Sequence, residues 1–447
     1  MIVISYIFHI LAVAIGIYCY VHGRKDYFVI SLYLIFSSFV GFIPSNQIHS
    51  PDWGMALAFG AMLLANIRKE TPTIVKEDTL GLLIFSMVGY IFVRAIFSII
   101  LIEDTSKDIL LTIRPVFFWL TYFAFRDISL YDLKKSLKII LPLMILQNCF
   151  IFLQLFGLSI FNYSPASFGD KLGVANNSDI LFFLLLQTNF RNWKFKKIII
   201  VLMLFLMFCS SRFHFILWLL FFIHYKTISL VKIHKKVLLI IAGIIIPFTL
   251  FCAYKLEIHK ILGGRYVEIE NDITNFSSIS RQSSIYDDYL QSGNSSTFLF
   301  RLNLAKEKWI YLVQHPAYLF FGVGPIYDDP NNKYNRFNFY LGTVRSDKRG
   351  FHQIETVDIA YVTHFFRYGL IGFIPYVLVL FYLFRNLNNV KNIDPIFHAS
   401  YSSFILYVFQ SLGSNKFDRF QFMYLILIIV GVSYNARKYG LLRNRDS

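Results

Sequence analysis

The chain has 447 residues, of which 56% are hydrophobic and 18% aromatic, and its mean hydropathy is +0.54. Soluble domains do not reach this apolar content, and because the apolar residues stand in continuous runs, neither an amphipathic soluble core nor an alternating β-barrel fits. The formal net charge of +16 lies in short loops without interleaved aromatic residues, which argues against a nucleic-acid partner.

The apolar runs predict an all-α polytopic integral membrane protein with about thirteen transmembrane helices. Before the one long loop, the runs cover residues 2–21, 27–43, 53–67, 80–101, 109–125, 139–157, 180–190, 198–209, 213–225 and 237–254. After it they cover residues 357–384, 396–412 and 420–434. We interpret the first run as an uncleaved helix, because no basic segment precedes it and no small-residue cleavage site follows.

Basic residues set the predicted orientation. They cluster on every second connection, whereas the intervening short loops hold isolated ones such as Lys107, Lys171 and Arg212. Because cytoplasmic loops are enriched in Lys and Arg, the N-terminus is predicted outside and the C-terminus in the cytoplasm. The chain then divides into N-terminal helices (1–254), a large external loop between the tenth and eleventh helices (255–355) and C-terminal helices (356–447).

The second half of the large loop contains a predicted amphipathic helix. Its apolar face is expected to consist of Phe298, Leu302, Ala305, Trp309 and Leu312, with Arg301, Lys306 and Lys308 off that face. Such a helix would lie on the membrane or cap a cavity, or equally pack within the loop domain. Pro316, Gly322, Gly324 and Pro325 then impose turns.

Residues 353–384 are the stretch around which the chain is organised. The stretch begins polar and runs into an apolar segment long enough to cross a bilayer, with Asp358, His364 and Arg367 near its start. Charges at the start of a membrane helix, beside a large external loop, indicate a binding site. Alternatively, these three side chains pair with one another at the interface.

Several arginines lie within or at the ends of apolar runs. Arg94 is in the middle of its run, whereas Arg114, Arg212 and Arg367 are near predicted external ends. Guanidinium groups gathered at one face would suit an anionic lipid head group, because Arg binds phosphate through two parallel hydrogen bonds. The alternative for each arginine is that it snorkels or forms a local ion pair.

Other site classes are not indicated. The chain has no GxxxxGK[ST], HExxH or CxxC motif, and its four cysteines lie apart in apolar runs. The pairs Asp287–Asp288 and Asp328–Asp329 could hold a cation, but adjacent acidic residues in loops are more often solvated turn residues. We therefore expect neither a metal nor a cofactor.

Three stretches resemble the bacterial O-antigen polymerases, which share a superfamily with the O-antigen ligases. CSSRFHFILWLLFF resembles the serine-arginine turn of that family, although Phe213 replaces the usual glycine after the Arg. RLNLAKEKWIYLVQHPAYLFFGVGP resembles the segment that joins an Arg and an aromatic helix to a His-Pro and a Gly-x-Gly-Pro turn. VDIAYVTHFFRYGLIG resembles the polymerase branch, in which an Asp precedes Arg-Tyr-Gly, whereas ligases tend to have His-Asn at 357–359.

This resemblance implies a membrane-embedded glycosyltransferase of GT-C type in the bacterial inner membrane, working at the periplasmic face. The growing glycan on undecaprenyl diphosphate would be moved onto a new lipid-linked repeat unit, with a polysaccharide chain-length regulator as a possible partner. Arg212 and Arg301 would bind the diphosphate, with Arg114, Arg367 and Arg94 as further candidates. Asp358 would be the general base, with His364 or His315 next.

Two other functions fit a chain of this kind. The first is a ligase that moves the finished glycan onto a lipid acceptor. The second is a flippase or exporter of lipid-linked oligosaccharides, which commonly shows two related halves and lacks one dominant external loop. This chain has the loop and no evident repeat, which favours an enzyme.

Overall fold

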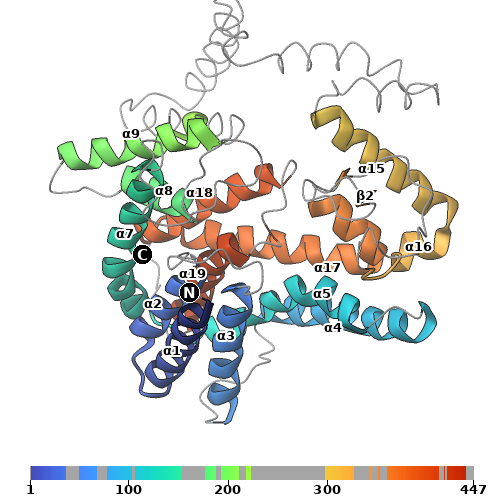
Figure 1. The fold of residues 1–447 in the computed structure, drawn as a ribbon, viewed down its shortest axis with the longest axis horizontal. Helices are drawn as coiled ribbons and strands as arrows, with labels where there is room; N and C mark the ends of the chain where they lie inside the picture. The colour runs from blue at the N-terminus through green and yellow to red at the C-terminus, as the bar shows by residue number, and fades with distance from the viewer. Residues whose placement is uncertain are drawn as a thin grey trace, which may run out of the picture.

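The computed structural model describes residues 2–36, 50–67, 78–102, 106–153, 177–187, 193–210, 218–222, 297–326, 343–344, 351–352, 360–411, 417 and 420–438. These residues form a predominantly helical protein (Figure 1). Among them, the helices over Thr79–Ile100, Leu130–Leu153 and Ala360–Val390 are long and apolar enough to cross a membrane. This confirms a helical fold of membrane-protein character, while the predicted number of thirteen spans stays a prediction because run 237–254 lies outside the described residues.

The first helices follow the predicted runs closely. They are α1 (Ile2–Val21), α2 (Lys25–Phe36), α3 (Ser50–Ile67) and α4 (Thr79–Ile102). The fifth run was predicted to be one helix. It consists instead of α5 (Ser106–Phe117), the 3₁₀ turn η1 (Phe118–Thr121) and α6 (Tyr122–Phe125). The Thr121 hydroxyl donates to the Phe118 carbonyl at 2.7 Å, and this competing side-chain bond accompanies the tighter turn.

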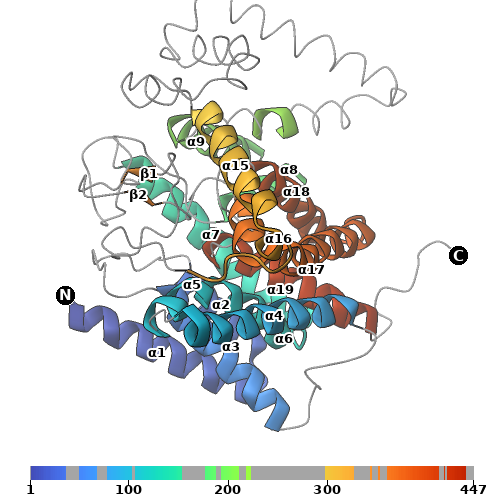
Figure 2. The same ribbon diagram turned by 90° about the vertical axis from the view of Figure 1, so that its right-hand side faces the viewer.

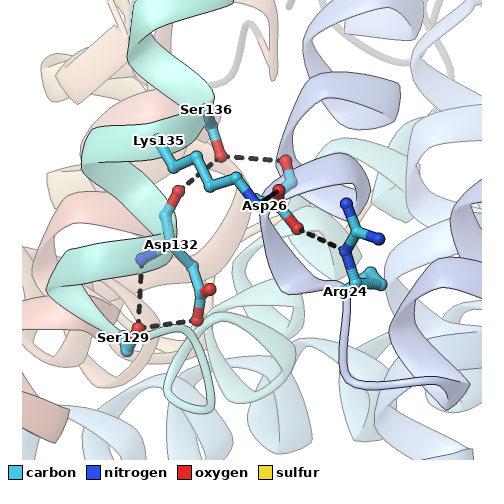
Figure 3. A network of polar contacts seen from close by, with 6 residues as sticks. All are labelled: Arg24, Asp26, Ser129, Asp132, Lys135 and Ser136. Carbon is cyan, nitrogen blue, oxygen red and sulfur yellow. Dashed lines mark hydrogen bonds and ion pairs between the residues drawn. The ribbon is translucent and has the colours of Figure 1, made fainter.

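Helix α7 (Leu130–Leu153) begins well before the predicted residue 139. Ser129 caps it: its Oγ accepts from the Asp132 backbone N–H at 3.1 Å and donates to the Asp132 carboxylate at 2.6 Å (Figure 3). This local cap starts the helix within a charged segment that hydropathy alone assigns to a loop. The next helices are α8 (Ser178–Gln187) and α9 (Trp193–Ser210).

The second half of the chain adds α15 (Thr297–Gln314), α16 (Pro316–Phe321), α17 (Ala360–Val390), α18 (Pro395–Gln410) and α19 (Phe420–Lys438). Two-residue strands β1 (Thr343–Val344) and β2 (Phe351–His352) pair antiparallel, with Thr343 opposite His352, an element the all-α prediction lacks. Helix α19 lies inside the bundle and is buried on all sides from Met423 to Val430. Figures 1 and 2 show α17 beside α4, with α15 and α16 along the same edge.

Helix α17 is sharply kinked, which corrects the prediction of an unbroken helix. Gly369 has φ 59° and ψ −168°, so a short helix before it and a long one after it meet at an angle. The rings of His364 and Tyr376 stack with centroids 4.0 Å apart. In a straight helix these positions would lie about 18 Å apart, so the first segment folds back beside the second.

A buried ion pair joins the start of α4 to the end of α6, at the end of the bundle predicted to be cytoplasmic. Arg126 Nη1 lies 2.8 Å from Asp78 Oδ2, and both side chains are nearly inaccessible to solvent. The other Asp78 oxygen accepts hydrogen bonds from the Gly81 N–H at 2.9 Å and the Tyr122 hydroxyl at 3.1 Å. The carboxylate is therefore saturated with donors, as a buried charge requires.

A second acidic residue, Asp26, links α2 to α7 (Figure 3). Its carboxylate contacts Lys135 Nζ at 2.6 Å and Arg24 Nε at 3.5 Å, while its backbone carbonyl accepts from the Ser136 hydroxyl at 2.8 Å. Burial raises the pKa of Asp26, but the hydrogen bonds from Lys135 and the Tyr27 N–H and the charges of Lys135 and Arg24 outweigh it. The pKa of Asp26 is lowered as a result.

We expect a pH-dependent contribution of Asp26 to stability. Because the carboxyl has a lower pKa in the fold than its value of about 3.9 in the unfolded chain, its contribution is complete above that pH and is lost as pH falls through the folded pKa. The melting temperature of the wild type in detergent should exceed that of Asp26→Asn at neutral pH, and the difference should shrink in acid. A difference that is independent of pH would contradict this linkage.

Candidate functional site

Residues Gly322–Ile326, which we call the Gly322 loop, follow α16 and lie buried between α4 and α17. The backbone N–H groups of Val323 and Gly324 donate to the carbonyls of Phe366 and Arg367 at 3.1 and 2.9 Å. The loop thus pairs with the segment of α17 just before the kink. Figure 2 shows α16 next to α17 above α4, at the point where the loop begins.

Two glycines allow this close approach. Gly322 and Gly369 have φ of 73° and 59°. A Cβ on Gly322 would lie 2.2 Å from the Arg367 carbonyl oxygen, and a Cβ on Gly369 would lie 2.4 Å from the Gly322 nitrogen. Only glycine permits both the backbone conformation and the contact between the two main chains.

Replacing Gly322 by alanine is expected to lower the free energy of unfolding by about 3 kcal/mol, because strained backbone and overlap with a neighbouring backbone add together. Gly23→Ala separates the two causes. Gly23 has a similar φ of 72°, but a Cβ at this position would have no neighbouring atom within 4 Å, so only the backbone strain remains. Gly89→Ala, in the open face of α4, should be neutral or stabilising. Thermal unfolding of the three purified variants measures the effects, and equal melting temperatures for Gly322→Ala and Gly23→Ala would exclude the close packing.

Arg94 reaches the loop from α4. Its Nη2 donates to the Gly322 carbonyl at 2.9 Å, and the side chain is partly buried. Among the described residues, no carboxylate forms an ion pair with Arg94, and its Nε has no hydrogen-bond partner. A guanidinium within a membrane helix without a counter-charge is costly, so an anion at this position would be stabilised.

Arg367 reaches the same loop from α17. Its Nη2 donates to the Ile326 carbonyl at 3.3 Å, and only 8% of the residue is exposed. Arg94 and Arg367 therefore hold opposite ends of the Gly322 loop. The structure brings together these two predicted anion-binding residues, which are far apart in the sequence.

The predicted histidines lie differently. His364 is buried, and its ring stacks on Tyr376 inside the folded-back part of α17. His315 is exposed at the start of α16 and stacks on Tyr311, with its Nδ1 2.9 Å from the Tyr311 carbonyl. That contact makes Nδ1 the donor, so the Nε2 atom of a neutral His315 would accept a proton.

The remaining predicted residues are not brought to the loop. Arg114 Nη1 forms a partly exposed ion pair with Asp52 of α3 at 3.2 Å, which is the local pairing considered as the alternative. Arg212 and Asp358 lie outside the described residues. Arg301 lies in α15, but its side chain is outside the described part of the structure.

Three further side chains at the junction escaped the sequence patterns. The Tyr90 hydroxyl lies 3.0 Å from the Phe321 carbonyl and 3.1 Å from the Tyr368 carbonyl, so it bridges α16 and α17. Ser98 is fully buried beside Gly324. Lys308, predicted on the polar face of α15, is instead buried, with its Nζ 5.6 Å from the Phe366 ring centroid. A serine and a tyrosine in an apolar run carry no signal of their own.

The face of α15 that packs against the protein is also rotated from the prediction. Leu304, Lys308 and Leu312 are buried, whereas Trp309 is 53% exposed. The predicted face follows hydrophobicity, which would be correct if water surrounded the helix. In this protein the outward face of α15 also carries large apolar side chains, with Trp309, Ile310 and Val313 exposed.

Another buried acidic residue, Asp179, lies in the first turn of α8. Its carboxylate accepts from the Trp218 indole N–H at 2.5 Å. Asn148 of α7 and Ser178 are hydrogen-bonded beside it at 3.0 Å. These contacts tie the first turn of α8 to α7 and to Trp218, which gives Asp179 a role in packing.

A scan against protein-family models, a search of curated proteins and a search of solved structures each return no match to this chain.

Proposed function

We propose that this chain is a membrane-embedded glycosyltransferase that polymerises oligosaccharides linked to undecaprenyl diphosphate. The observation that best supports the proposal is the convergence of Arg94 and Arg367 on the Gly322 loop. This loop belongs to the HPAYLFFGVGP segment, and Arg367 belongs to the HFFRYGLIG segment. Both segments carry the resemblance to O-antigen polymerases, and their contact supports a common site.

The proposed reaction needs little acid catalysis. The acceptor hydroxyl oxygen attacks the anomeric carbon of the donor glycan, the bond from that carbon to the diphosphate oxygen breaks, and undecaprenyl diphosphate leaves with the electron pair. The diphosphate is a good leaving group once its charge is matched, which is the role we assign to Arg94 and Arg367, with Arg212 and Arg301 as further ligands. Arg114 has a carboxylate partner and is a weaker candidate.

The acceptor proton needs a base. Asp358 remains the first choice. His364, which is buried beside the kink of α17, and His315, at the turn between α15 and α16, are the next choices. The proposed site faces the periplasm of the bacterial inner membrane, and a polysaccharide chain-length regulator is the expected protein partner.

Gene deletion in the source bacterium distinguishes the proposal from the ligase and the flippase. Loss of polymerase should collapse the lipopolysaccharide ladder on a gel to core plus a single repeat. Bare core with long glycan accumulating on undecaprenyl diphosphate would establish a ligase instead. Bare core with single lipid-linked units retained inside would establish a flippase.

The role of Asp358 is tested by two variants in the same ladder assay. If Asp358 is the base, both Asp358→Ala and Asp358→Asn should reduce polymer formation by about 10²- to 10⁴-fold, since neither side chain accepts the proton. Activity retained in Asp358→Asn but lost in Asp358→Ala would leave only a positioning role.

A further inference from the structure

The chain from the end of α16 through the Gly322 loop follows α4 in an ordered way. The Phe321 carbonyl lies against Tyr90, the Gly322 carbonyl against Arg94, and Gly324 against Ser98. At 1.5 Å per residue, Tyr90, Arg94 and Ser98 are about 18, 12 and 6 Å from the Ile102 end of α4. After Phe321 the backbone therefore rises along α4 towards that end, and Leu312 of α15 packs with Val323 and Ile326 on the rising part, so the chain descends from Leu312 to Phe321.

Helix α4 is a candidate membrane span over Thr79–Ile100, so these positions lie within the hydrocarbon core. Irregular backbone is tolerated at such depth only where its polar groups are satisfied by protein. The loop meets this requirement, because its residues are buried and Tyr90, Arg94 and Arg367 donate to carbonyls in or just before it.

The outward surface of the same segment is mostly apolar, with Gln314 and His315 as exposed polar side chains at the turn between α15 and α16. Six exposed side chains form what we call the α15–α16 apolar face: Trp309, Ile310, Val313, Tyr318, Phe320 and Phe321. It continues onto the spans on either side, whose exposed residues include Phe92, Ile96 and Phe97 on α4 and Ile371 and Ile374 on α17. The ring of Trp309 stacks on Phe365 of α17, at 5.7 Å between centroids, which joins the two surfaces.

We infer that α15, α16 and the Gly322 loop form a re-entrant membrane hairpin whose α15–α16 apolar face contacts lipid acyl chains. Lys306, exposed one turn before Trp309, lies at the head-group level and Phe320 and Phe321 lie deepest. The hairpin belongs to the large loop predicted to be external, whose amphipathic helix was expected to lie on the membrane, cap a cavity or pack within the loop. The inference does not depend on the chemistry of the proposed reaction.

Spin labels test the depth. In a full-length chain with Cys19, Cys149, Cys209 and Cys252 replaced by serine, single cysteines at Lys306, Trp309, Val313 and Phe320 are labelled with a nitroxide and reconstituted into phosphatidylcholine vesicles. The ratio of collision with oxygen to collision with a water-soluble nickel chelate should rise in that order. At Phe320 it should approach the value at the lipid-facing control Phe97→Cys.

An exposed position on α5, Lys107→Cys, supplies the aqueous control. Nickel access at Phe320 equal to that at Lys107 would overturn the inference, and so would exclusion of both reagents, which would mean that protein covers the face. In the native cysteine background, brominated phospholipids should quench the tryptophan fluorescence of the wild type more strongly than that of the Trp309→Phe variant. Equal quenching in the two proteins would contradict lipid contact.

Discussion

Asp78→Ala is expected to lower the free energy of unfolding by about 3–5 kcal/mol, because it leaves the Arg126 guanidinium in a site that excludes water without its carboxylate partner. The Gly81 N–H and the Tyr122 hydroxyl lose their acceptor in the same substitution. Denaturant unfolding of the purified protein in detergent measures the loss. The Asp78–Arg126 ion pair also links α4 to α6, so the loss of stability should be accompanied by partial unfolding at this end of the bundle.

Two comparisons make this prediction specific. Lys134→Met breaks an ion pair with Asp394, but half of the lysine is exposed, so the cost should be about 1 kcal/mol or less. The double variant Asp78→Ala/Arg126→Ala should be less destabilised than the two single variants summed. Strict additivity would show that the two residues do not depend on each other.

Arg94→Gln is expected to abolish polymer formation, with a loss of about 10²- to 10³-fold, if the guanidinium stabilises charge on the departing diphosphate. Glutamine removes the positive charge and, because its side chain is two bonds shorter, also the direct hydrogen bond to the Gly322 carbonyl. Arg94→Lys, which keeps the charge but not the two-pronged geometry, should retain part of the activity. Chain extension of a lipid-linked repeat by purified variants is the measurement.

Tyr90→Phe is the matched control for Arg94. It removes a hydrogen bond to the carbonyls of Phe321 and Tyr368 without changing charge, at a cost in stability of about 1 kcal/mol. If Arg94 only anchors the loop, Arg94→Gln and Tyr90→Phe should behave alike, with normal chain extension. That result would remove Arg94 from the proposed diphosphate site.

The sequence predicted well those features that depend on neighbours in the chain. The bounds of α1, α4 and α19 follow from continuous apolar runs, because a membrane segment must be apolar along its whole length. The early start of α7 was predictable in principle from Ser129 and Asp132, which form a local cap. The turns at Gly322 and Gly324 were likewise indicated by their residue types.

The candidate site was predicted less completely. The positions of Arg94 and Arg367 in apolar runs showed that both need polar partners. The sequence did not show that both would donate to carbonyls of the same loop. The pairing of Arg114 with Asp52 depends on how α3 packs against α5. The burial of Lys308 depends on which side of α15 meets α17.

By itself, then, the sequence determined that this is a helical membrane protein and where most described helices begin and end, because burial in lipid and helix capping act on residues close together in the chain. Only the tertiary structure decided that Gly369 bends α17 and that the Gly322 loop enters the space between α4 and α17. The contacts with α4 join residues hundreds of positions apart, and no local pattern encodes which carbonyl a buried guanidinium will meet.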